Sequence, residues 1–220
     1  MNCKMDTTCY LGKKVFIGID VHKRSYSLSA VCEDVIVKKW SMPAEIDSCV
    51  SVILSHFNGA NIYTAYEAGF SGYSLHRKLI SQGINSIVVC PSSIQKSPND
   101  RVKTDLLDSK KLAIHLSKGM LRGIHVPSVE QERKREITRL RSQLVDHRIT
   151  VSNQIKSKLM YFGEPGPEGK KRISKKFLGE LLGRNLPFEL MISLKALTKL
   201  WIQLTDQIYE VEKEIAGQEA

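Results

Sequence analysis

The order of strand-like and helix-like segments in residues 15–90 is the feature that most narrows the folds open to this chain. Three strand-like segments come first, and only Glu33-Asp34 separates the second from the third, a gap of hairpin size. The pattern then alternates between helix and strand. The predicted strands are VFIGIDV (15–21), SYSLSAVC (25–32), VIVKKWSM (35–42), IYTAYE (62–67) and INSIVVC (84–90).

Two helices connect the later strands. Apolar residues recur at helical spacing from Ile46 to Phe57, and a second helix is expected from Ser71 to Gln82. Right-handed crossovers then place the fourth and fifth strands beside the first and parallel to it. The expected fold is therefore α/β, with a ribonuclease-H-like mixed sheet of strand order 3-2-1-4-5.

The second half of the chain is helical. A charged helix is predicted over 129–162, a loop over 163–172 and a further helix from Phe188 to the end. In the last helix apolar residues alternate in steps of four and three, which indicates a coiled-coil dimer, an intramolecular helical hairpin, or both at once. These residues are Leu190, Leu194, Leu197, Trp201, Leu204, Ile208, Val211 and Ile215.

This pattern predicts three regions. Residues 1–14 are expected to form a disordered N-terminus, residues 15–127 the α/β domain, and residues 128–220 a helical coiled-coil region for nucleic-acid binding and dimerisation.

Composition narrows the class of partner. The chain has 33 Lys and Arg against 23 Asp and Glu, a formal charge of +10, which favours a polyanion such as nucleic acid or an anionic membrane surface. No apolar run approaches the ~18–20 residues of a membrane span, and no secretory signal is visible. The five cysteines form no CxxC pair and are expected to be reduced thiols of a cytoplasmic protein, with Cys32 and Cys90 buried in strands.

Four acids fall where an open α/β sheet places its ligands. Asp20 and Glu67 end the first and fourth strands, and the carboxyl ends of parallel strands form the usual ligand edge. Asp105 and Asp108 open the helix after the fifth strand and share one helix face. Each acid alone has an ordinary explanation, such as a favourable helix-dipole position. Asp20, however, ends an apolar strand in the middle of the sheet, a costly place for a charge without a role.

Four carboxylates at one edge repel one another unless cations neutralise them. Their hard oxygen atoms suit Mg²⁺ and, less selectively, Mn²⁺. Two such ions roughly 3.5–4 Å apart would serve phosphodiester chemistry.

Several stretches carry a family resemblance: IGIDVHK (17–23), YEAGFSGYSLHRKL (66–79) and VVCPSSIQKSPNDRVKTDLLDSKKLA (88–113), followed by the long helix. Over about residues 15–160 the chain resembles the DEDD transposases of bacterial insertion sequences, the "one-ten" family, whose N-terminal domain is RuvC-like. The family is named after four catalytic acids, Asp, Glu, Asp and Asp (DEDD). The resemblance implies that these acids are Asp20, Glu67, Asp105 and Asp108 in this chain.

The resemblance also implies partners. Proteins of this family cut and rejoin DNA of a mobile element, and some are guided by a structured RNA from that element. They carry a C-terminal domain with a serine nucleophile after the coiled coil. The chain reaches Ala220 where that domain would begin, so we expect a fragment or truncated product, or a polypeptide that does not perform the full reaction.

Basic residues near the acids and on the helices are candidate nucleic-acid contacts. The candidates are His22, Lys23, Lys96, Arg101, Lys103, Arg133, Arg135, Arg139, Lys170, Lys171 and Arg172. The alternative to nucleic-acid binding is that these basic residues simply lie on a solvated turn, loop or helix surface. The sequence does not indicate whether the nucleic acid would be DNA or RNA.

Two other functions stay open at this point. One is a junction-resolving endonuclease of the same fold, complete as it stands. The other is a non-catalytic fragment that binds nucleic acid and dimerises.

Overall fold

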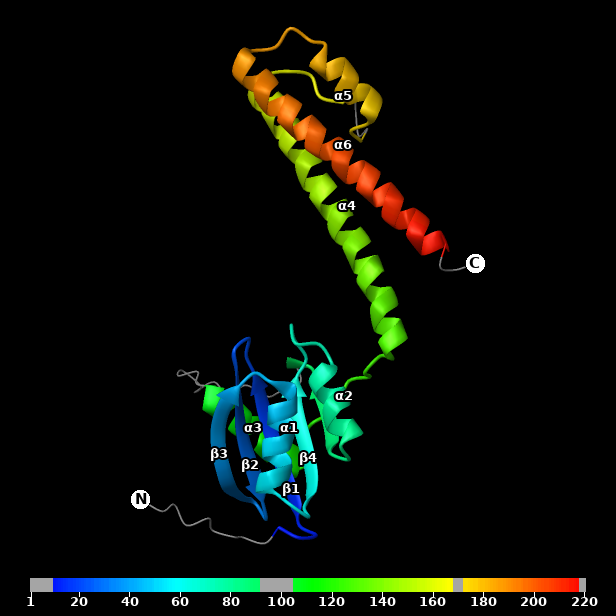
Figure 1. Ribbon diagram of the computed structural model, residues 1–220. Helices are drawn as coiled ribbons and strands as arrows, with labels where there is room; N and C mark the ends of the chain where they lie inside the picture. The colour runs from blue at the N-terminus through cyan, green and yellow to red at the C-terminus, as the bar shows by residue number, and fades with distance from the viewer. Residues whose placement is uncertain (1–9, 92–104, 168–171, 218–220) are drawn as a thin grey trace. The chain divides into compact units, whose positions relative to one another are not determined.

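The computed structural model describes residues 10–91, 105–167 and 172–217, and in the helix that starts at Asp105 it describes side chains from Asp108 onward (Figure 1). The chain divides into two compact units, one ending at Val126 and the other starting at Pro127. No helix in the described ranges has the length and apolar content needed to cross a membrane.

The first unit contains one five-stranded sheet. Its strands are β1 (Lys14–Val21), β2 (Ser25–Cys32), β3 (Val35–Pro43), β4 (Asn61–Glu67) and β5 (Asn85–Val89). Their order is β3-β2-β1-β4-β5, with antiparallel pairs among β1, β2 and β3, and with β4 and β5 parallel to β1. The predicted ribonuclease-H-like sheet is confirmed.

Helices cover both faces of this sheet (Figure 1). The helices of the first unit are α1 (Ile46–His56), α2 (Ser74–Ser81) and α3 (Asp105–Ser117). Side chains from α1 and α2, such as Ile53 and Leu79, form the main core with Ile17 and Ile19 of β1. The α3 helix packs on the opposite face, which is the face that matters for the candidate site.

The β2–β3 hairpin shows how local sequence fixes the sheet. Glu33 and Asp34 both adopt left-handed backbone angles, with φ of 51° and 62°. This is the two-residue turn whose twist matches that of antiparallel strands.

One local expectation for the first unit was wrong. Cys90 is exposed because β5 ends at Val89, whereas Cys32 is buried as predicted. Within the predicted N-terminal segment 1–14, the Tyr10 ring packs on Phe57 at 5.0 Å and β1 starts at Lys14. Residues 1–9 lie outside the described part of the chain.

The second unit is an antiparallel helical hairpin with a short helix beside it. It consists of α4 (Val129–Tyr161), α5 (Lys175–Leu182) and α6 (Phe188–Gly217). Trp201 of α6 donates a hydrogen bond to Ser152 of α4 over 2.9 Å, and Arg141 of α4 binds Glu212 of α6. The earlier residue on α4 thus pairs with the later residue on α6, so the two helices are antiparallel.

The heptad pattern of α6 thus serves packing within the chain. Leu190, Leu194, Trp201, Leu204 and Ile208 are all buried, and most belong to one core with Val151, Ile155 and Leu159 of α4. Of the two alternatives, the structure contains the intramolecular hairpin; dimerisation through the helices stays a prediction. The sequence did not predict α5, which lies just after the expected 163–172 loop.

Candidate functional site

Asp20 and Glu67 lie on one face of the sheet, on neighbouring strands. Ile19 and Tyr66 point into the core under α1 and α2, so the residue that follows each of them points to the opposite face. The register pairs Ile19 with Tyr66, the residues that directly precede Asp20 and Glu67 on the two adjacent strands. Both acids therefore stand at the carboxyl end of a parallel strand pair, facing α3.

The start of α3 lies at the same edge. Gly18 of β1 faces Ser109 and Ala113, and Ser117 at the end of α3 lines a surface pocket with Lys14 near the start of β1. The α3 helix therefore runs opposite to β1, and its first turn lies at the carboxyl end of β1. Asp108 in this turn is half-buried.

The four acids come from segments that meet at this edge, but the described side chains do not form a closed ligand set. Among the described residues, no group of three or more His, Cys, Asp or Glu side chains is arranged to hold a metal ion. The Asp105 side chain lies outside the described residues. The donor chemistry, hard carboxylate oxygens on two strands and one helix start, fits a divalent metal such as Mg²⁺.

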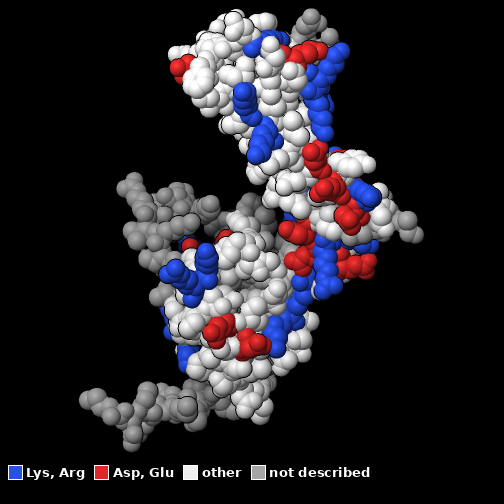
Figure 2. Space-filling view, turned by 45° about the horizontal axis from the view of Figure 1, so that its top comes forward, with Lys and Arg blue, Asp and Glu red and all other residues white. Residues whose placement is uncertain are grey.

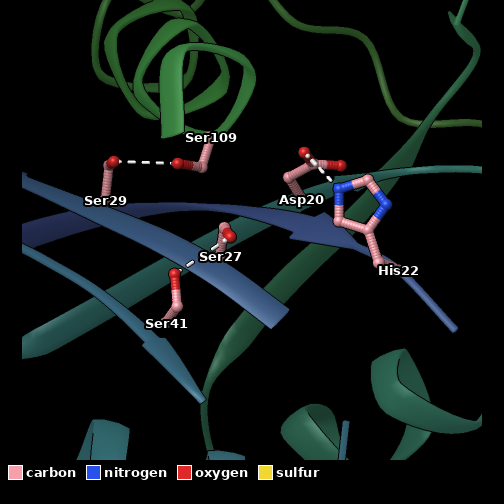
Figure 3. A network of polar contacts seen from close by, with 6 residues as sticks. All are labelled: Asp20, His22, Ser27, Ser29, Ser41 and Ser109. Atoms are coloured by element: carbon pink, nitrogen blue, oxygen red, sulfur yellow. Dashed lines mark hydrogen bonds and ion pairs between the residues drawn. The ribbon is translucent and has the colours of Figure 1, made fainter. Parts of the chain in front are cut away.

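His22 contacts Asp20. Its Nε2 atom lies 3.0 Å from Asp20 Oδ2, at hydrogen-bond distance, and the two side chains are 42% and 21% exposed (Figure 3). An N–H at Nε2 donates to the carboxylate and restricts the orientation of Asp20. The next residue, Lys23, is exposed at the same end of β1.

A buried tyrosine anchors the loop that follows Glu67. The Tyr66 hydroxyl donates a hydrogen bond to the Gly72 carbonyl over 3.1 Å, and burial raises the pKa of Tyr66 to about 12. The hydroxyl therefore stays protonated and keeps donating at any physiological pH. Sequence reasoning missed this role, because a tyrosine in a strand equally suggests ordinary core packing.

Two hydroxyls join β2 to α3. Ser29 and Ser109 are fully buried and their Oγ atoms lie 2.9 Å apart, while Ser27 pairs with Ser41 of β3 over 3.1 Å (Figure 3). Sequence reasoning missed these residues too. The available signals were the glycine inside the apolar strand VFIGIDV, which suggests close backbone approach, and the serines inside SYSLSAVC.

The predicted basic residues are dispersed. Arg133, Arg135 and Arg139 are exposed on α4, and Arg172 is exposed before α5. Lys96, Arg101, Lys103, Lys170 and Lys171 lie outside the described residues. Figure 2 shows both acidic and basic side chains on the visible face of the helical unit. On α4, Lys134 and Glu130 form an ion pair at 3.0 Å.

A family model decides the relationship. The model of the IS110-type DEDD transposases, described as "Transposase", matches residues 17–162, from within β1 to just past the end of α4. The chain belongs to this family. The matched range includes all four candidate acids.

Named relatives agree with this assignment. The protein y4qE of Sinorhizobium fredii, described as a transposase, is 34% identical over 173 residues, which are 76% of this chain and 43% of that protein. The transposase for insertion sequence element IS1533 of Leptospira borgpetersenii is 32% identical over 139 residues, 60% of this chain and 39% of its own length. The chain thus spans about two-fifths of the length of the curated relatives it matches.

Solved structures show a weaker likeness. Thermus thermophilus RuvC in complex with a Holliday junction substrate is 12% identical, with a TM-score of 0.36, and covers 50% of this chain and 99% of its own. A second RuvC structure from this organism is 11% identical, with a TM-score of 0.38. The family assignment does not depend on this likeness.

Proposed function

We propose that the first unit supplies the metal-binding part of an insertion-sequence transposase active site, which cleaves and joins DNA strands. The ligands would be Asp20, Glu67, Asp105 and Asp108. The observation that supports this most is the shared edge: two acids side by side on neighbouring strands, beneath the first turn of a helix that contributes two more.

Magnesium or manganese bound there would neutralise the carboxylates and act as a Lewis acid on a phosphodiester. The protein's own part is to hold the carboxylates at fixed positions and to orient them. His22 restricts one oxygen of Asp20 through the 3.0 Å contact. Tyr66 holds the loop after Glu67 through its bond to Gly72.

The nucleic acid would be held by charge rather than by base contacts. Arg133, Arg135, Arg139 and Arg172 are exposed and can reach phosphates. We assign the same role to His22 and Lys23 and, outside the described residues, to Lys96, Arg101, Lys103, Lys170 and Lys171.

The family resemblance extends the proposal to the whole protein. It implies DNA of the element ends and target as substrates and a structured guide RNA as a further partner. From the heptad pattern of α6 and the cysteine content we also propose oligomers formed through the helical unit and action in the cytoplasm. The resemblance also implies a serine nucleophile on a C-terminal domain. We therefore do not assign a nucleophilic role to a serine of residues 1–220, and for these residues the proposal is limited to binding metal and nucleic acid.

Mn²⁺ titration of the 220-residue chain tests this proposal. Calorimetry should find Mn²⁺ binding to the parent, and Asp20→Asn should lose more than the ~10–100-fold typical of changes to outer-shell partners of a metal. Asp34→Asn is the matched control, because Asp34 is exposed in the β2–β3 turn and Asn tolerates its left-handed backbone. Equal binding by the parent and Asp20→Asn overturns the proposal.

Cleavage assays separate this function from that of a complete junction nuclease. Mg²⁺-dependent cutting of four-way DNA junctions by the chain alone, abolished in Asp20→Asn, would contradict the need for a further catalytic domain. Metal and DNA binding without cutting is the expected result.

A further inference from the structure

The α3 helix approaches β1 more closely than any side chain would permit. A Cβ atom placed on Gly18 would lie 2.1 Å from the Ser109 carbonyl oxygen, 2.5 Å from the Ala113 nitrogen and 2.7 Å from the Leu112 Cβ. Two of these atoms belong to the helix backbone and cannot rotate away. The depth at which α3 lies on the sheet therefore requires glycine at position 18.

A buried hydrogen bond fixes α3 in a second direction. Ser29 is the β2 partner of Gly18, and its hydroxyl meets that of Ser109 over 2.9 Å, with both residues 0% exposed (Figure 3). Sliding or rotating the helix would separate the two hydroxyls and leave both buried without this partner. We call Gly18, Ser29 and Ser109 the α3 seat.

Residues of the α3 seat are close in sequence to the candidate acids, both in β1 and in α3. Gly18 precedes Asp20 by two residues and shares its sheet face, and Ser109 directly follows Asp108. Asp20 is carried by a strand and Asp108 by a helix, 88 positions later in the sequence. Their separation is therefore set by how α3 sits on β1, and the α3 seat controls both the depth and the alignment of that contact.

We propose that Gly18, Ser29 and Ser109 are positioning residues that set the distance between the carboxylates of β1 and those of α3. This inference rests on the proposed function, because it assigns the α3 seat to the same metal site. None of the three residues needs to touch the metal or the nucleic acid. A metal ion coordinated from two elements responds to small displacements between them, whereas ordinary core packing tolerates them better.

A purely structural role makes a different prediction. If the α3 seat only stabilised the fold, its variants would lower the melting temperature, and Mn²⁺ affinity would change only when the protein unfolds. A core variant on the opposite face provides the comparison. Leu79 of α2 is fully buried there, and we expect Leu79→Ala to remove packing on that face and to leave α3 in place.

The experiment compares Gly18→Ala and the double variant Ser29→Ala/Ser109→Ala with Leu79→Ala in the full chain. Mn²⁺ affinity is measured by calorimetry at a temperature where circular dichroism shows each variant folded, and amide hydrogen exchange reports on α3. We expect about tenfold weaker Mn²⁺ binding for Gly18→Ala and a smaller loss for the double variant. Leu79→Ala should keep the parent affinity despite a lower melting temperature.

Each outcome decides a different point. Parent-like Mn²⁺ affinity in Gly18→Ala and in the double variant overturns the positioning role and leaves the proposed function standing. Absence of Mn²⁺ binding by the parent overturns the proposed function itself. If Gly18→Ala does not fold, the double variant decides, because it replaces both hydroxyls of the 2.9 Å pair with smaller side chains. Equal losses in Leu79→Ala and the α3 seat variants also contradict the inference.

Discussion

The two units build their candidate functional surfaces in opposite ways. In the first, Asp20, Glu67 and Asp108 come from separate segments, and sheet register and the packing of α3 bring those segments to one edge. In the second, Arg135 and Arg139 recur along one helix and need no partner to reach the surface. The first surface should therefore be sensitive to geometry, and the second to the number of charges.

Ion pairs within the helical unit strengthen this contrast. Lys134 lies 3.0 Å from Glu130, and Arg141 lies 2.6 Å from Glu212 of the facing helix. Exposed pairs of this kind add little stability. They reduce the positive potential, so only part of the basic content of α4 is available to a polyanion.

The largest expected effect is on the stability of the helical unit. Trp201 is 6% exposed, packs in the α4–α6 core and donates a hydrogen bond to Ser152. Trp201→Ala should cost about 3–5 kcal/mol of unfolding free energy in that unit, measured by urea denaturation. Mn²⁺ affinity should not change, because the candidate ligands lie in the other unit. A parallel loss of Mn²⁺ binding would break the comparison.

Next in size is the loss of a ligand from the sheet edge. Glu67→Gln keeps the size of the side chain but removes a charged oxygen donor, so Mn²⁺ affinity should fall at least about tenfold in calorimetry. Glu33→Gln is the matched control, since Glu33 is exposed in the β2–β3 turn. If the two variants bind Mn²⁺ equally, Glu67 is not a ligand.

Removing basic charges from α4 should weaken the salt dependence of DNA binding. Arg135→Gln with Arg139→Gln should reduce the slope of log affinity for double-stranded DNA against log salt concentration by about 2, because each phosphate contact contributes ~0.9. Lys13→Gln with Lys78→Gln removes the same charge from lysines already paired with Glu33 and Asp47. Equal slopes in the two double variants would mean that net charge, not α4, governs binding.

The smallest effect concerns the start of α4. Ser128 caps this helix through a reciprocal capping box with Gln131. Ser128→Ala should cost about 1 kcal/mol of stability in the helical unit, measured by thermal denaturation. Ser142→Ala, in the exposed middle of α4, should cost nothing measurable. Similar losses in both variants would rule out the cap as the cause.

The sequence predicted the parts of the fold that follow from local pattern and chain topology. The strand order follows from the order of elements and crossover handedness, and the turn at Glu33-Asp34 from its length. The α4 and α6 helices follow from their apolar periodicity. The α5 helix was missed because eight residues next to a basic loop give too short a periodic signal.

The details of the site depend on contacts between distant residues. Gly18 and Ser109 are 91 positions apart, and no local pattern indicates that one accommodates the backbone of the other. The heptad pattern of α6 was likewise compatible with a hairpin and with a dimer, and only the contact of Trp201 with Ser152 of α4 shows that the hairpin is present. The exposure of Cys90 was mispredicted because β5 ends one residue earlier than expected, at Val89.

The central claim is that acids from β1, β4 and α3 share a divalent metal. Anomalous diffraction from crystals of the chain grown with Mn²⁺ tests it most directly. We predict anomalous peaks at the carboxyl ends of β1 and β4, within bonding distance of Asp20, Glu67 and an aspartate of α3. Well-ordered acids at this edge without a peak, or peaks only elsewhere on the molecule, would contradict the claim.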